Sequence, residues 1–94
     1  MGPGEVTHID SLSDIGSLLS EREKTHGNFD DTAAVIQGLK NVMRGSPNWG
    51  KLNPVHRESL EMMANKVGRI LVGDPYYPDH WHDIAGYAQL GATS

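Results

Sequence analysis

The 94-residue sequence contains no cysteine, only one phenylalanine, and no long apolar run. Without cysteine the chain can form neither a disulfide framework nor a thiolate metal site, so its stability must come from packing. No stretch approaches the roughly 20 apolar residues that span a bilayer, and residues 1–6 lack the basic cluster and apolar core of an export signal. We therefore expect a protein without a membrane partner that stays in the cytoplasm, or in the host cytoplasm if its source is a virus.

Positive charge is also scarce, because twelve acidic residues face eight Lys and Arg, which gives a formal net charge of -4. Domains that neutralise a nucleic-acid backbone usually have a basic face, so we expect no nucleic-acid partner. A small phosphorylated ligand held through a divalent cation remains compatible with this charge. A chain of this length buries only a modest fraction of its surface, and a helical protein of this size gains from pairing with copies of itself.

Apolar periodicity predicts four helices and no paired strands. They run from residue 11 or 13 to about 24, from 29 to about 44, from 54 to about 72, and from 78 or 79 to 90. Asn53 before Pro54 is a favoured helix start, and Gly27 is a favoured helix end. The short connections favour antiparallel neighbours, so the predicted fold class is all-α, a four-helix bundle.

The first nine residues have too few apolar groups at any period to become ordered. We expect residues 1–9 to form a loose arm, followed by a single domain over residues 10–94.

Polar residues gather on one side of the third and fourth predicted helices. In the third helix these are Glu58, Glu61, Asn65 and Arg69; in the fourth, Asp79 and Asp83, flanked by His80 and Tyr87. If the two helices pack as a hairpin, their acidic stripes face a shared cleft. Carboxylates that close repel one another unless a cation intervenes, and an oxygen-rich site suits Mg²⁺ or Mn²⁺. Spacing alone leaves open that these are ordinary solvated surface charges.

Two short motifs separate these readings. Residues 57–61, Arg-Glu-Ser-Leu-Glu, are followed after an 18-residue gap by residues 80–83, His-Trp-His-Asp. This pattern resembles the Glu-Glu-x-x-Glu, spacer, Glu-x-x-Asp motif of the all-α nucleoside triphosphate pyrophosphohydrolases of the MazG type. Residues 20–29, the Lys66-x-x-Arg69 pair and residues 83–88 look like short MazG-like proteins carried by bacteriophages. The resemblance spans roughly residues 18–91.

The resemblance implies a MazG-like bundle completed by a neighbouring subunit, in a homodimer or homotetramer. It implies Mg²⁺-dependent hydrolysis of a (deoxy)nucleoside triphosphate to the monophosphate and pyrophosphate. Glu58, Glu61 and Asp83 match metal-ligand positions of the motif, and Glu58 or Glu61 is the candidate that orients the attacking water. Arg57 and His80 stand where the motif has glutamate. Asp79, or the ring nitrogen of His80, would then complete the ligand set.

Candidate substrate-binding residues also follow from the resemblance. Lys66 and Arg69 would neutralise the charge that develops on the leaving group. His26, Asn28 and Phe29, at the turn between the first two predicted helices, would contact the base. Four of them have a structural alternative: Asn28 suits a helix C-cap, Phe29 suits the core, Lys66 suits a solvated surface position, and Arg69 suits an ion pair with the acidic stripe.

Three other functions compete with this interpretation of the sequence. His82-Asp83 forms the dipeptide of HD-domain phosphohydrolases, but those enzymes need further metal ligands on several more helices than this chain offers. A zinc site is disfavoured because no two of the five histidines lie four residues apart. A non-catalytic helical interaction or inhibitor protein, which binds a partner through its acidic face, is favoured by the net charge and by the two departures from the motif.

Overall fold

The computed structural model describes the backbone of residues 3–94 and the side chains of residues 15–94. Its elements are α1 (Pro3–His26), α2 (Phe29–Arg44), the short 3-10 helix η1 (Trp49–Lys51), α3 (Pro54–Val72) and α4 (Pro78–Ala92). No strand occurs within the described backbone. The predicted all-α fold with four long helices is therefore confirmed.

Local chemistry explains where the helices begin. Asn28 caps α2, because its side-chain oxygen accepts a hydrogen bond of 2.9 Å from the backbone N–H of Asp30. Asn53 caps α3 in the same way through the N–H of His56, at 2.8 Å, and a proline follows it at the first helical position. Gly27, between α1 and α2, has a φ of 83°, a left-handed conformation that suits glycine.

The beginning of α1 differs from the expectation. The helix begins at Pro3 rather than at residue 11 or 13, so residues 3–9, which were expected to form a loose arm, are helical. Proline is well tolerated in the first helical turn, and residues 5–15 contain neither glycine nor proline to interrupt the helix. The helical backbone therefore extends over residues that have no apolar periodicity. Residues 1 and 2 lie outside the described residues.

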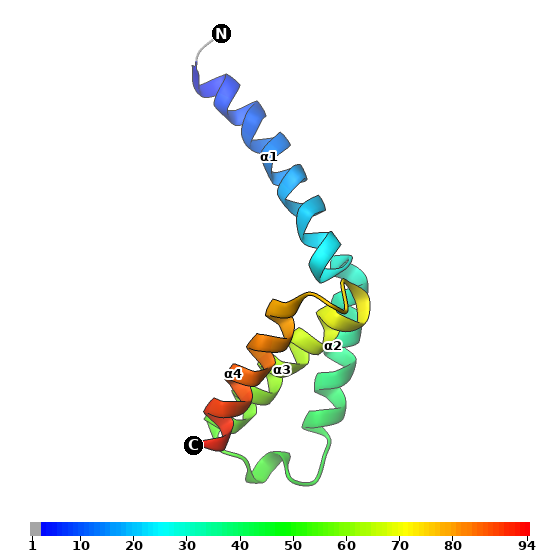
Figure 1. Ribbon diagram of the computed structural model, residues 1–94, viewed down its shortest axis with the longest axis vertical. Helices are drawn as coiled ribbons and strands as arrows, with labels where there is room; N and C mark the ends of the chain where they lie inside the picture. Colours follow the sequence, from blue (N-terminus) through cyan, green and yellow to red (C-terminus); the bar gives the residue numbers. More distant parts are fainter. Residues whose placement is uncertain (1–2) are drawn as a thin grey trace.

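Helix α3 is the central element, because it contacts α2 and α4, while the end of α1 contacts α2 and α3. Figure 1 shows α2, α3 and α4 alongside one another and α1 extending away from them. The molecule is accordingly elongated, with extents of 60 × 24 × 23 Å. None of the described helices is long and apolar enough to cross a membrane.

Small residues let α2 and α4 approach α3 closely from two sides. A Cβ atom placed on Gly68 of α3 would lie only 2.4 Å from Cγ1 of Ile36 on α2. On the α4 side, a Cβ placed on Gly91 would lie 3.7 Å from Cβ of Ser59. Ser59 and Gly68 are both buried, as is Ala64 between them. The contacts with α2 and with α4 therefore cover two sides of α3 and leave the sides between them uncovered.

Large apolar side chains remain exposed on several helices. Among the described side chains Ala64 is the only buried apolar one, whereas Leu18 and Leu19 on α1 are 58% and 55% exposed and Leu71 on α3 is 64% exposed. A single copy of the chain therefore has very little hydrophobic core, and such exposed patches are typical of surfaces that other molecules cover.

The close contact at Gly68 generates a prediction. Gly68→Ala should destabilise the fold by about 1–3 kcal/mol, because the new methyl group collides with Ile36 and forces α2 away. Gly38→Ala, in α2, is the matched control: a Cβ there meets nothing within 4 Å. This second variant should stabilise the protein by about 0.5–1 kcal/mol, because alanine favours a helix more than glycine does.

Urea denaturation of both variants, at one fixed protein concentration, measures these changes in the free energy of unfolding. If Gly68→Ala stabilised the protein as much as Gly38→Ala, the close packing of α2 on α3 would be wrong.

Candidate functional site

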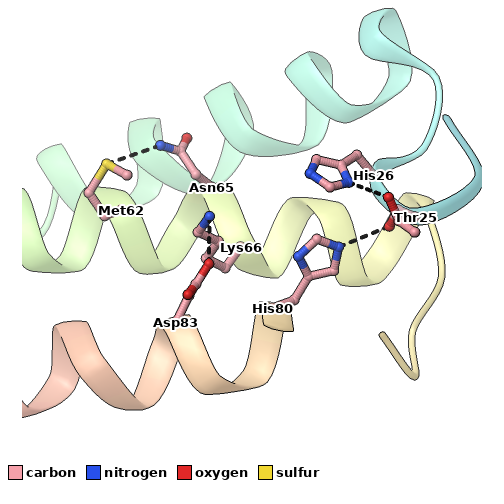
Figure 2. A network of polar contacts seen from close by, with 7 residues as sticks. All are labelled: Thr25, His26, Met62, Asn65, Lys66, His80 and Asp83. Carbon is pink, nitrogen blue, oxygen red and sulfur yellow. Dashed lines mark hydrogen bonds and ion pairs between the residues drawn. The ribbon is translucent and has the colours of Figure 1, made fainter. Parts of the chain in front are cut away.

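Helix α3 has a polar face between its two neighbours. Glu58, Met62, Asn65 and Arg69 follow one another at three- and four-residue spacing, which places them on one side of the helix. This side lies between the line of contact with α2 and the line of contact with α4. We call these four residues, with Glu61 at the α2 edge and Lys66 at the α4 edge, the polar face. Figure 2 shows three of these residues, Met62, Asn65 and Lys66, with Asn65 on the side of α2 and Lys66 paired with Asp83 of α4.

At the α4 edge of the polar face, Lys66 pairs with Asp83. The Nζ atom of Lys66 lies 2.9 Å from Oδ2 of Asp83 (Figure 2), and the lysine side chain is only 12% exposed. Hydrogen bonding to Lys66 holds the pKa of the Asp83 carboxyl below its usual value. Lys66 is thus a largely buried partner of Asp83, and Asp83 is ionised at neutral pH.

At the α2 edge, Glu61 forms an ion pair with Arg44, the last residue of α2. Glu58 lies one turn earlier on the same face and is exposed. Asp79, in the first turn of α4, is exposed too, and hydrogen bonding to it raises the pKa of the neighbouring Tyr77.

Glu58 and Glu61 lie on the polar face of α3, and Asp83 lies beside it on α4, but these carboxylates do not form a joint ligand set. Within residues 15–94, no three His, Asp or Glu side chains stand close enough together to hold a metal ion. Glu61 and Asp83 are paired with cations at opposite edges. Each of these two carboxylates is stabilised by the opposite charge of its own partner and not by a shared cation. The type of donor atom still fits a hard divalent cation, which prefers carboxylate oxygens such as those of Glu58, Glu61 and Asp83.

His80 has a structural role at the junction of α1 and α4. It is 1% exposed, and its Nε2–H donates to the backbone carbonyl of Thr25 at 2.9 Å. Its ring packs edge-on against the rings of His26 and Tyr77, each at a centroid distance of 4.9 Å. These contacts tie the first turn of α4 to the end of α1, as Figure 2 shows for Thr25 and His26. The Nε2 atom of His80 is thereby engaged in holding the fold.

The three residues expected to contact a base separate in the structure. Asn28 is the N-cap of α2, so the alternative expectation that it forms a helix C-cap is wrong. Phe29, at the first position of α2, is 79% exposed, so the alternative expectation that it packs in the core is wrong too. His26 is partly buried, with Nδ1 2.6 Å from the Thr25 hydroxyl. Burial, together with the positive charge of Arg69, lowers the pKa of His26.

A groove of about 570 Å³ lies where the end of α1 meets α2 and α3. His26, Phe29 and Arg69, all expected from the sequence, line it, and Asn65 extends it onto the polar face. Its other basic residues are Arg22 of α1 and Lys40 of α2, which the sequence analysis missed. The available signal was weak: each lies three or four residues from an apolar residue of the same groove wall, Leu19 and Ile36.

The protein thus belongs to the all-α class and has a charged face on its central helix with a groove beside it. No family model matches the chain, and no match is found among the curated proteins or among the solved structures.

The lowered pKa of His26 predicts how stability depends on pH. Between the unfolded pKa of about 6.5 and the lower folded value, the unfolded chain binds the proton more tightly, so the free energy of unfolding falls as the pH falls through this window. Urea denaturation at pH 7.5 and pH 5.5 should show this loss in the wild type. It should be smaller in His26→Gln, which has no titrating ring at this position.

His82→Gln is the control, because His82 is exposed on α4. It should retain the full pH dependence of the wild type. Asp83 does not affect the comparison, since hydrogen bonding to Lys66 lowers the pKa of its carboxyl further below this pH range. An unchanged pH dependence in His26→Gln would show that the buried junction does not depress the pKa of this residue.

Proposed function

We propose that the protein is a Mg²⁺-dependent nucleoside triphosphate pyrophosphohydrolase of the cytoplasm, which converts a (d)NTP and water into the (d)NMP and pyrophosphate. The observation that carries the proposal is the polar face. It combines Glu58 and Glu61 with Arg69 on α3, and the Lys66–Asp83 pair brings a carboxylate of α4 to its edge. A triphosphate needs both kinds of group: carboxylates for the divalent cation and Lys or Arg for the phosphates.

In this proposal Glu58, Glu61 and Asp83 hold Mg²⁺ or Mn²⁺, with Asp79 as a further carboxylate at the start of α4. The cation, when bound, supplies Lewis-acid charge against the phosphate oxygens and lowers the pKa of water. The remaining roles belong to the chain. Glu58 or Glu61 accepts the proton of the attacking water, and Arg69 neutralises the pyrophosphate as it leaves.

The ion pairs at the two edges give the proposal a specific requirement. Lys66 keeps Asp83 ionised and Arg44 pairs with Glu61, and both carboxylates must exchange these partners for the cation. Lys66, released from Asp83, then adds positive charge beside Arg69 for the phosphates. Substrate and cation together supply the opposite charges that the exchange needs, because the triphosphate is anionic.

The second candidate is a non-catalytic helical protein that binds another protein through its acidic groups. Its support is the formal net charge of -4 and the exposure of Glu58 and Asp79, two acids that no ion pair among the described side chains engages.

The enzymatic proposal predicts that the purified protein, incubated with Mg²⁺ and each common NTP and dNTP in turn, releases pyrophosphate from at least one. Glu61→Gln should reduce this release to background, because the amide keeps the size of the side chain but loses the charge that binds the cation. Glu21→Gln, an exposed acid of α1 that pairs with Lys24, is the control and should keep full activity.

No release with any nucleotide, at protein concentrations near that of the substrate, would favour the interaction protein instead. Unchanged turnover in Glu61→Gln would mean that the reaction takes place elsewhere. Circular dichroism and thermal melting of both variants separate a lost ligand from a lost fold.

We also propose that the protein is a homodimer or homotetramer. The support is the amount of exposed apolar surface, on α1 at Leu18 and Leu19 and on the side of α3 that carries Leu71. Equilibrium sedimentation at micromolar concentration should give at least twice the mass of one chain. A species with the mass of one chain would contradict this proposal.

A further inference from the structure

We propose that the groove between the end of α1, α2 and α3 binds the nucleoside phosphate directly, without a divalent cation. The base lies on the apolar wall at Leu19 and Phe29, and Arg22 and Lys40 hold the phosphates together with Arg69. This inference rests on the proposed function and deepens it, since it assigns two residues that neither the motif nor the polar face includes.

The size and walls of the groove suit a small molecule. Its volume of about 570 Å³ falls within the roughly 300–1,000 Å³ typical of ligand sites. Three helices contribute to it, and most of the surface that lines it is apolar, although eight of its thirteen lining residues are polar or charged. This combination orients a ligand that has a flat apolar part and a charged part.

Charge favours an anion as the occupant. The groove holds Arg22, Lys40 and Arg69 against one acid, Glu23, in a chain whose formal net charge is -4. In the part of the chain with described side chains, the ion pairs engage Lys24, Arg44 and Lys66 and leave these three basic residues available. Positive groups grouped in a concave apolar wall concentrate an attractive potential for phosphate.

The apolar wall favours an aromatic group on the anion. Phe29 is 79% exposed and Leu19 is 55% exposed, and both border the groove. A planar base stacked on an exposed phenylalanine removes apolar area from water, and base–aromatic stacking contributes about 1–3 kcal/mol. Inorganic phosphate has no group that can make this contact.

The groove also leads toward the proposed reaction centre. Helices α2 and α3 run antiparallel, because Ile36 lies against Gly68 while Arg44 pairs with Glu61. Lys40 lies one turn from each of the two α2 residues and is therefore level with Asn65, which is one turn, about 5.4 Å, from Glu61. Phosphates that extend from the base toward Lys40 thus approach the carboxylates of the polar face.

Isothermal titration calorimetry in EDTA, with α,β-methylene analogues of the four common dNTPs as probes, tests the proposal without metal and without turnover. At least one analogue should bind, and Arg22→Gln and Lys40→Gln should each weaken its binding by about tenfold or more. Lys51→Gln, an exposed lysine of η1 outside the groove, is the matched control and should bind as the wild type does.

Tripolyphosphate, as a second probe, separates the two parts of the site. Phe29→Ala should weaken the binding of the nucleotide analogue but leave that of tripolyphosphate unchanged, whereas Arg22→Gln should weaken both. Equal weakening by Lys51→Gln and Lys40→Gln would reduce the effect to net charge and overturn the proposal.

The outcomes also separate this inference from the proposed function. Binding in EDTA that depends on Arg22 and Lys40, in a protein that releases no pyrophosphate, would support the groove and contradict the enzyme. Pyrophosphate release with no binding of any analogue in EDTA, or with a Michaelis constant unchanged in Arg22→Gln and Lys40→Gln, would support the enzyme and overturn the groove.

Discussion

The close packing of α2 and α4 on the small residues of α3 is the constraint on which the rest of the structure depends. Gly68 admits Ile36 on one side, and Ser59 meets Gly91 on the other. With these two sides of α3 covered, the side chains between them form the polar face. Leu71, outside both contacts, is left exposed and apolar. The same packing thus separates a charged face from an apolar surface that a second copy of the chain can cover.

The buried His80 adds a second constraint, since it holds the end of α1 against the start of α4. Its bond to the Thr25 carbonyl fixes the last turn of α1 beside the start of α4, although most of α1 extends away from the other helices. The groove depends on this junction, because the end of α1 that His80 holds in place carries Arg22 and forms one wall of the groove. His80 therefore contributes through packing and hydrogen bonding.

The balance of charge decides how the polar face could work. Arg44 neutralises Glu61 on this face, and Lys66 neutralises Asp83 on the neighbouring helix α4. A divalent cation must therefore compete with two ion pairs. The Arg44–Glu61 pair is partly exposed, and pairs of this kind contribute about 0–1 kcal/mol to stability. Lys66 is only 12% exposed, so its release from Asp83 leaves a largely buried charge that needs a new partner. A ligand that brings its own negative charge can stabilise the released Lys66, and this links phosphate binding and cation binding in the proposed mechanism.

The sequence by itself determined the helices and several of their ends, because capping and apolar periodicity are local properties. Asn53 caps α3 as its position before Pro54 indicates, and α2 and α3 have the expected bounds. It also placed Glu58, Glu61 and Arg69 on one side of α3, since helical spacing alone decides this. Only the tertiary structure decided the partner of each charge, the burial of His80 and the meeting of Arg22 with Lys40. These depend on how closely separate helices approach, which no local pattern of residues specifies.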